Sequence, residues 1–189
     1  METMIMETPS RRVLCNPSIK DKITFIRTAE ESHDAITEIE VELAPKGGND
    51  LHYHKSFDEE FTAIEGNLGL EVNGRKITLK PGETAIAKKG EHHRFFNPSD
   101  TETILFIVRI TPGNTGFENC LRIAYGLAND GKIGKSGLPS IPVMALLMEM
   151  GDTGVTGGIG AVVKPLFKLI ARRARRRGLE LELLKKYVF

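Results

Sequence analysis

Three side chains that can bind a metal ion lie close together in residues 52–66. His52 and His54 are two residues apart and Glu59 follows five residues later, which gives the pattern H-x-H-x4-E-x6-G. Alternate side chains of a strand point to the same face, so both imidazoles would project together. Residues 55–58 can return the chain, so a second strand beginning at Glu59 brings its carboxylate beside them. Two imidazoles and one carboxylate form an incomplete site for a divalent metal ion.

A further ligand is expected from residues 82–97. Together the two stretches resemble the paired signature of the cupin superfamily, G-x5-H-x-H-x3,4-E-x6-G followed by G-x5-P-x-G-x2-H-x3-N. The second motif is matched by Gly82, Gly90, His93 and Asn97. Two positions depart from it: Lys88 replaces the usual proline, and Gly47 comes one residue late. Neither departure touches a ligand, and the resemblance covers residues 35–112.

The resemblance implies one divalent metal ion per chain, held by His52, His54, Glu59 and His93. Iron, manganese, nickel and zinc all suit three imidazoles and a carboxylate, so the residues do not choose among these metals. One step along a strand turns a side chain to the opposite face. Glu60 and His92, each next to an expected ligand, should therefore point away from the metal.

The rest of residues 11–112 reads as short strands separated by turns. Residues 13–15, 22–28, 35–43 and 104–110 are strand-like, and Asn73-Gly74 fits a two-residue hairpin turn. Strands with no helix between them indicate a sandwich or barrel. The resemblance narrows this to an all-β fold, the double-stranded β-helix or jelly-roll barrel of cupins, with a C-terminal α-helical extension. Phe61 and Phe95 are candidates for the wall of a substrate pocket, whereas Leu68 and Leu70 are expected in the core.

Composition and charge separate the chain into two parts. The 189 residues are 40% hydrophobic and 27% charged, as in a soluble globular protein. Residues 1–112 carry 14 Lys/Arg against 19 Asp/Glu, a net charge of −5, and residues 113–189 carry 12 against 6, a net charge of +6. We interpret residues 1–10 as a flexible tail, 11–112 as the barrel and 113–189 as the helical extension. The overall charge of +1 gives no reason to expect nucleic-acid binding.

Helical patterns and glycine-rich stretches alternate in the extension. Thr115 and Glu118 fit a capping box at the start of a first helix, which should stop near residues 129–131. Residues 141–150 predict a short apolar helix, and residues 151–160 read as a flexible connector. An amphipathic helix is expected over residues 163–177, with Pro165 in its first turn. Its apolar face would comprise Val163, Leu166, Phe167, Ile170 and Ala174.

Two interpretations of the helix at 163–177 stay open. The favoured one is an outer helix packed on the barrel or on a partner subunit, with its basic side in water. The other is peripheral attachment to anionic lipid. A nucleic-acid surface is less favoured because no aromatic residues are interleaved with the arginines.

Three function classes follow for a small organic ligand. The first is a metal-dependent dioxygenase, the second a metal-assisted isomerase or lyase, and the third a non-catalytic binding module; the fold hosts all three. Catalytic residues other than the metal ligands are unknown, because the sequence shows no acid–base pair. We expect a homodimer, because a small barrel leaves sheet edges that a second subunit can cover. Two cysteines without a disulfide pattern, and no signal-peptide layout, favour the cytoplasm.

Overall fold

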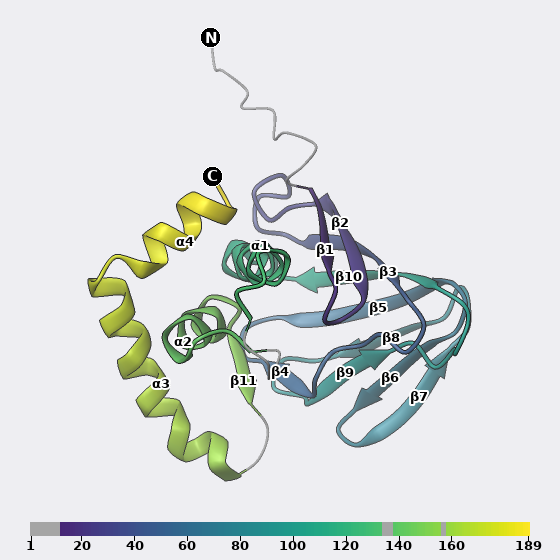
Figure 1. Cartoon of the computed structure of the whole chain (residues 1–189). Coiled ribbons are helices and arrows are strands. Elements are labelled where there is room, and N and C mark those ends of the chain that lie inside the picture. The colour runs from purple at the N-terminus through teal and green to yellow at the C-terminus, as the bar shows by residue number, and fades with distance from the viewer. Residues whose placement is uncertain (1–11, 134–137, 156–157) are drawn as a thin grey trace.

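The computed structural model describes residues 12–133, 138–155 and 158–189, so the expected tail at 1–10 lies outside it. Most of the strands precede the first helix (Figure 1). The strands are β1 (Val13–Asn16), β2 (Asp21–Arg27), β3 (Thr37–Leu43), β4 (His52–His54), β5 (Asp58–Glu65), β6 (Leu68–Val72), β7 (Arg75–Leu79), β8 (Thr84–Ala87), β9 (His93–Phe96), β10 (Ile104–Thr111) and β11 (Thr153–Val155). The helices are α1 (Thr115–Asn129), α2 (Ile141–Met150), α3 (Gly158–Arg176) and α4 (Leu179–Tyr187).

The strands form two antiparallel sheets. A six-stranded sheet has the order β1-β2-β3-β10-β5-β8, and a five-stranded sheet has the order β11-β4-β9-β6-β7. From β3 to β10 the chain passes repeatedly from one sheet to the other, which is the winding of a double-stranded β-helix. The predicted barrel with a C-terminal helical extension is therefore confirmed.

Alternation along the strands builds the core. In β3, every second residue from Thr37 to Leu43 is buried and the glutamates between them are partly exposed, as the sequence predicts. Asn73 and Gly74 have φ angles of 49° and 79°, the left-handed conformation that a tight hairpin turn requires. Leu68 and Leu70 are buried in the barrel core, as expected.

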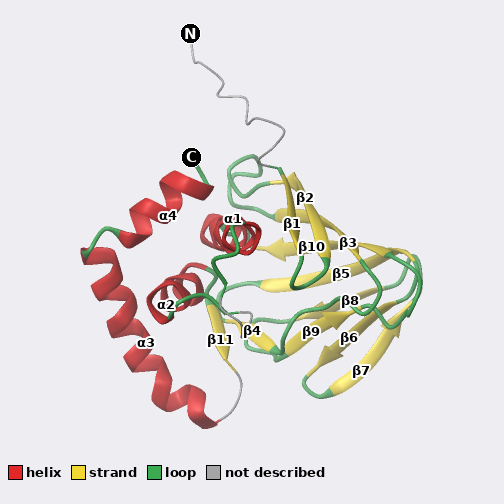
Figure 2. Cartoon of the chain, viewed as in Figure 1, coloured by secondary structure: helices red, strands yellow, loops and turns green. Residues whose placement is uncertain are grey.

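The helices lie together on one side of the barrel (Figure 2). A second hydrophobic cluster joins α1, α2, α3 and α4, with Ile123, Leu146, Ala171 and Leu183 among its buried members. In the described part of the chain, no helix is both long enough and apolar enough to cross a membrane.

Two predicted features of α1 need correction. Asn114 rather than Thr115 is the N-cap, and its Oδ1 accepts a hydrogen bond from the backbone N–H of Phe117 at 2.8 Å. Asparagine caps at least as well as threonine, so the two neighbouring candidates compete at this position. Glu118 does not complete a capping box. Its carboxylate is buried and accepts hydrogen bonds from the Ala29 N–H and the Thr37 hydroxyl, both at 2.6 Å, which ties the helix to the barrel.

The interpretation of residues 151–160 as a connector is wrong for most of its length. Residues 153–155 form β11, which extends the five-stranded sheet beside β4 (Figure 1). Residues 158–160 already belong to α3, and residues 156–157 lie outside the described part. A glycine-rich segment can still become a strand when an exposed sheet edge offers it hydrogen bonds.

The helix expected at 163–177 is longer than predicted. It begins at Gly158, so Pro165 lies inside it rather than in its first turn. The buried side of the described part includes Ala171 and Ala174, with Phe167 and Ile170 packed against them, whereas Leu166 is exposed. Packing against α2 and α4 decides which side of the described part of this helix is buried.

Candidate metal centre

Four side chains converge inside the barrel. Potential ligand atoms of His52, His54, Glu59 and His93 all lie within 4.8 Å of one another. His54, Glu59 and His93 are buried, while His52 is partly exposed and forms the side of the cluster nearest to solvent. The structure therefore brings together the four residues that the two motifs single out.

Both sheets contribute to the cluster. His52 and His54 come from β4, and His52 pairs directly with His93 of β9 in the five-stranded sheet. Glu59 comes from β5 in the six-stranded sheet and faces them across the barrel. The polar turn between β4 and β5 makes the change of sheet, so the five-residue spacing places the carboxylate opposite the imidazoles.

Backbone carbonyls fix the orientation of all three imidazole rings. The Nδ1 atoms of His52, His54 and His93 lie 2.8, 3.0 and 2.9 Å from the carbonyl oxygens of Asp50, Gly151 and Glu91 respectively. A carbonyl can only accept, so each Nδ1 carries the hydrogen and donates it. Each neutral ring then has its free electron pair on Nε2, the atom that points into the cluster.

The inward atoms fit a shared cation. The Nε2 atoms of His52 and His54 are 3.1 Å apart, and both carry electron pairs in the tautomer that the carbonyls select. The Nε2 of His93 lies 2.6 Å from one Glu59 oxygen, and the Nε2 of His54 lies 3.8 Å from the other. A divalent ion among these atoms would replace repulsion between electron pairs by coordination. The donor set, three imidazoles and one carboxylate, could therefore hold one divalent metal ion.

Burial and mutual charge shape the electrostatics of the cluster. Burial lowers the pKa of His52 to about 4 and also lowers that of His54, which keeps both rings neutral. Burial disfavours the charged forms of Glu59 and His93, but the hydrogen bond and the opposite charges of this pair outweigh it, so the pKa of Glu59 falls to about 2 and that of His93 is raised. Without a metal ion, the protonated His93 ring donates from Nε2 to Glu59, and metal binding would displace that proton. Neutral imidazoles and an ionised carboxylate are the forms that bind metal.

Aromatic rings enclose the ligands. Phe57 stacks on the His54 ring with centroids 4.4 Å apart, and Phe117 of α1 meets the same ring edge-on at 5.3 Å. Phe61 lies 6.0 Å from the His93 ring. Phe95 lies one layer further away, 6.4 Å from Phe61, and packs against Phe106. Phe61 therefore contacts a candidate ligand and Phe95 packs against Phe61, while their place in the wall of a substrate pocket stays a prediction.

Phe57 and Phe117 are site residues that the sequence reasoning missed. Phe57 lies between the ligands of the first motif, so its position there was a usable signal. Phe117 comes from α1, more than 60 residues after His54, and no spacing rule connects the two. Only the packing of α1 against the open end of the barrel brings its ring to His54.

The C-terminal extension also reaches the cluster. Strand β11 pairs with β4, so that Thr153 lies opposite His54 and Gly154 opposite Tyr53. The Gly151 carbonyl that holds His54 belongs to the turn just before this strand, and the Thr153 hydroxyl lies 3.4 Å from the same Nδ1. We call residues 151–155 the strap. The strap therefore helps to hold His54, a candidate ligand that lies about 100 residues earlier in the sequence.

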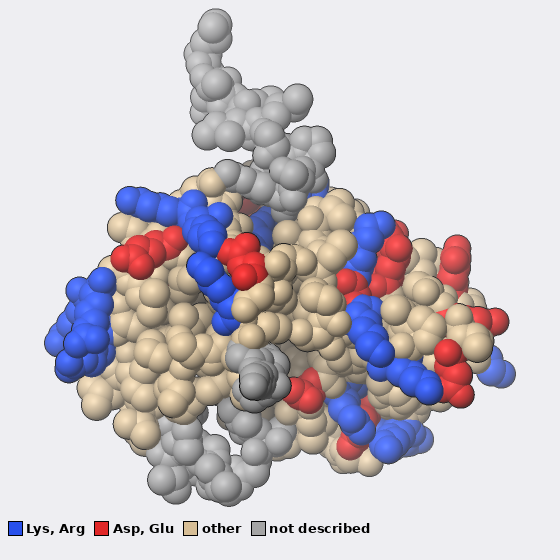
Figure 3. Space-filling model, viewed as in Figure 1, with Lys and Arg blue, Asp and Glu red and all other residues tan. Residues whose placement is uncertain are grey.

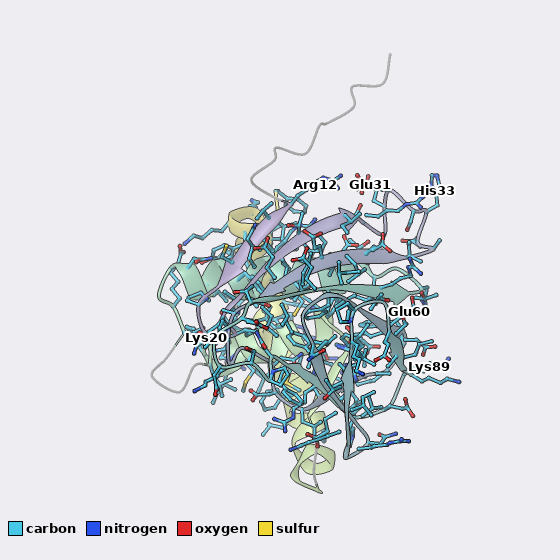
Figure 4. The ribbon with its side chains drawn as sticks, turned by 90° about the vertical axis from the view of Figure 1, so that its right-hand side faces the viewer. Arg12, Lys20, Glu31, His33, Glu60 and Lys89 are labelled. Carbon is cyan, nitrogen blue, oxygen red and sulfur yellow. The ribbon has the colours of Figure 1, made fainter. Side chains whose placement is uncertain are left out.

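Neighbours of the ligands point away, as strand alternation predicts. Glu60 pairs with Arg109 at 3.1 Å on the outside of the barrel (Figure 4). His92 lies against Tyr53, with ring centroids 5.1 Å apart, and Arg94 pairs with Glu71.

Asn97, the last residue of the second motif, is buried and donates from Nδ2 to the carbonyls of Leu43 and Glu102. Its role is to hold the turn after β9.

Comparisons with known proteins agree with this architecture. A family model described as "Cupin domain" matches residues 39–109. The tetracenomycin polyketide synthase protein TcmJ of Streptomyces glaucescens is 37% identical over 57 residues, 30% of this chain and 38% of that protein. An uncharacterized protein of Aquifex aeolicus is 30% identical over 105 residues, 50% of this chain and 87% of that protein. This chain therefore spans well under half of the Streptomyces protein.

A solved structure also matches part of the chain. The crystal structure of a predicted oxalate decarboxylase from Thermotoga maritima shares 19% identity with a TM-score of 0.49. The similarity covers 57% of this chain and 99% of the Thermotoga chain.

Proposed function

Because the chain belongs to the cupin superfamily, we propose that it binds one divalent metal ion and uses it on a small organic molecule. His52, His54, Glu59 and His93 are the ligands in this proposal. Three neutral imidazoles and one carboxylate offset only part of a dication's charge, so anionic or electron-rich oxygen atoms are its natural further ligands.

The chemistry we propose is that of a metal-dependent dioxygenase. A bound ion would supply open coordination positions for dioxygen and for a substrate oxygen, or would polarise a carbonyl as a Lewis acid. The chain's own residues hold the three imidazoles in one tautomer and keep water from the buried side. The partly exposed edge at His52 is the side from which a substrate can approach.

One observation favours the dioxygenase over acid–base chemistry. Two acidic neighbours act on the ligands through their charge, but Asp152 pairs with Lys55 and Glu91 with Asn73. In the described part of the chain, the side chains in ring or hydrogen-bond contact with the ligands are those of Phe57, Phe61, Phe117 and Thr153. None of these carries a carboxylate, amine or imidazole that could serve as a separate proton donor or acceptor. An apolar aromatic wall suits a reaction in which the metal ion holds both reactants, because no extra base is needed there.

A metal-assisted isomerase or lyase is the second candidate. The observation that favours it is the identity to part of a protein whose name places it in polyketide synthesis. Rearrangements of such ketone-rich chains pass through enolates, which a Lewis acid stabilises. A substrate of this class would offer two neighbouring oxygen atoms and an aromatic body for Phe57 and Phe61 to contact.

The test loads the protein with Fe²⁺ without oxygen and then adds nitric oxide, which mimics dioxygen and needs no substrate. We expect an electron paramagnetic resonance signal from an iron–nitrosyl species, and its loss in His54→Ala. Iron-loaded protein without that signal would contradict the dioxygenase and leave the Lewis-acid function or a non-catalytic module. Oxygen uptake with catechol as a probe of adjacent oxygens then tests the substrate class.

A further inference from the structure

Helix α3 turns two leucines and several arginines to solvent. Leu166 and Leu169 are 54% and 64% exposed, among the most exposed large apolar side chains that the structure describes. Arg172, Arg173 and Arg176 follow at helical spacing, so with Leu169 they lie along one side of the helix. Leu169 and the arginines, including Arg177 just beyond the helix, line one open depression. We call the side formed by Leu166, Leu169, Arg172, Arg173, Arg176 and Arg177 the outer face of α3.

The opposite side of the helix is already engaged. Ala171 and Ala174 are buried against α2 and α4, and Phe167 and Ile170 pack with them. The helix thus packs on α2 and α4, whereas the favoured interpretation placed it on the barrel or on a partner subunit. This packing accounts only for the inner side. The outer face has no packing role in the described chain.

Charge on and around the outer face is strongly one-sided. Residues 153–179 contain seven Lys or Arg and no Asp or Glu. Of the acidic residues next to this range, Asp152 pairs with Lys55. Glu149 and Glu180 both pair with Arg175, which points toward α2 and α4. In the described part of the chain, no ion pair is recorded for the four arginines of the outer face. Figure 3 shows the resulting group of basic side chains at the edge of the molecule where α3 lies.

We propose that the outer face of α3 binds the surface of an anionic lipid bilayer. A bilayer interface accommodates both kinds of side chain, because leucines enter the boundary between headgroups and acyl chains while guanidinium groups stay at the phosphates. A nucleic acid would use the arginines and leave the leucines in water, and the outer face has no aromatic side chain on which a base could stack. The helix would lie on the bilayer surface and would not cross it.

Vesicle co-sedimentation of the full-length, metal-loaded protein tests the proposal. The probes are vesicles of equimolar phosphatidylcholine and phosphatidylglycerol, and vesicles of phosphatidylcholine alone. We expect binding to the mixed vesicles at low salt, loss of that binding as salt screens the charges, and little binding to the neutral vesicles. Absence of binding to the mixed vesicles at low salt would overturn the proposal.

Matched variants separate charge from insertion. Arg172→Gln/Arg173→Gln should weaken binding roughly 25-fold, since each basic residue near the surface contributes about fivefold. Leu166→Gln/Leu169→Gln should weaken it by at least about tenfold, because each leucine loses apolar burial. The control Arg75→Gln/Lys76→Gln makes the same charge change in β7, across the barrel from the helices (Figure 1), and should bind like the wild type.

Three outcomes would contradict the assignment to lipid. A control variant that loses as much binding as the arginine variant would mean that only overall charge matters. Leucine variants that bind like the wild type would exclude insertion. A short duplex DNA that binds at the same salt, with the leucine variants unaffected, would assign the outer face to nucleic acid. All variants change exposed side chains, so unchanged circular dichroism and metal content verify their fold.

Discussion

Two adjacent carboxylates in β5 point to opposite faces of the strand, one toward the candidate metal site and one toward solvent. Glu59 is buried beside His93 and His54, while Glu60 pairs with Arg109 on the outside of the barrel. We expect Glu59→Gln to lower the metal affinity by more than about 10-fold. Removing a residue that only hydrogen-bonds to a metal ligand already costs about 10-fold or more, and Glu59 is itself a candidate ligand. Glu60→Gln is the matched control. It should leave the affinity unchanged, because an exposed ion pair contributes only about 0–1 kcal/mol. Calorimetric metal titration compares the two, and equal affinities would remove Glu59 from the ligand set.

Asp21 is a buried carboxyl away from the metal cluster. Its Oδ2 accepts a hydrogen bond from the Tyr125 hydroxyl at 2.5 Å, and its Oδ1 has no partner in the described part of the chain. Burial raises the pKa of Asp21 from 3.8 to about 6, against the opposing effect of the Tyr125 bond. The folded protein therefore keeps a proton on Asp21 that the unfolded chain releases near pH 3.8. The stability that this proton supports is fully present below pH 3.8 and is lost as the pH rises through 6.

The Asp21→Asn variant removes this titration. The free energy of unfolding of the wild type, measured relative to the variant, should fall by up to about 3 kcal/mol between pH 4 and pH 7. This figure follows from about 1.4 kcal/mol for each unit by which folding raises the pKa of Asp21. Urea unfolding of both proteins at the two pH values measures the change. A difference that does not vary with pH would show that Asp21 ionises normally in the folded protein.

At the scale of elements, the strap joins the helical extension to the metal centre. A Cβ added to Gly154 would lie 2.0 Å from the Cζ of Tyr53, and its three nearest atoms all belong to the Tyr53 side chain. Gly154→Ala should therefore push β11 away from β4 and withdraw the Gly151 carbonyl from His54. We expect the metal affinity to fall about 10–100-fold, the usual effect of losing an outer partner of a histidine ligand.

A second substitution serves as the control for the strap. Tyr53→Ala removes the ring atoms that the added Cβ would meet, so Tyr53→Ala/Gly154→Ala should recover most of the affinity. Tyr53 points away from the ligands, and Tyr53→Ala alone should bind metal nearly normally. A folded Gly154→Ala protein with wild-type affinity would show that the strap does not position His54.

The strap also marks where sequence reasoning stops. Strands with clear alternation, such as β3, and the ligands of β4, β5 and β9 follow from local pattern and from two motifs, because both act over a few residues. Strand β11 is three residues of a glycine-rich segment, and its partner lies about 100 residues earlier. Helix α4 and the C-terminal half of α3 are held by packing between helices. These features depend on long-range contacts that neither periodicity nor capping patterns record.

At the scale of the whole molecule, a barrel and a helical layer share one boundary. Glu118 and Phe117 of α1 contact the barrel, and α2 leads directly into the strap. Deleting the extension would therefore disturb the metal centre as well as the helices. Tests of the outer face of α3 accordingly use substitutions in the full chain.

The expected homodimer stays a prediction at this scale. Strand β1 lies at an edge of the six-stranded sheet and has exposed residues, Val13 and Cys15 among them. The Cys15 carbonyl of this edge accepts a hydrogen bond from Asn129 of α1, and a second copy would cover the rest of the strand. Light scattering should give twice the chain mass of 20.9 kDa. A species of 20.9 kDa over a wide range of concentrations would contradict the dimer.

Metal content is the most direct test of the central claim that His52, His54, Glu59 and His93 form one divalent metal site. The measurement is elemental analysis of protein purified without an affinity tag, before and after incubation with Fe²⁺, Mn²⁺, Ni²⁺ or Zn²⁺. The geometry predicts about one ion per chain in the wild type, because four ligand atoms lie within 4.8 Å of one another. It also predicts no bound ion in a folded His54→Ala variant. Wild-type protein that is free of metal and cannot be loaded with any of the four would contradict the account.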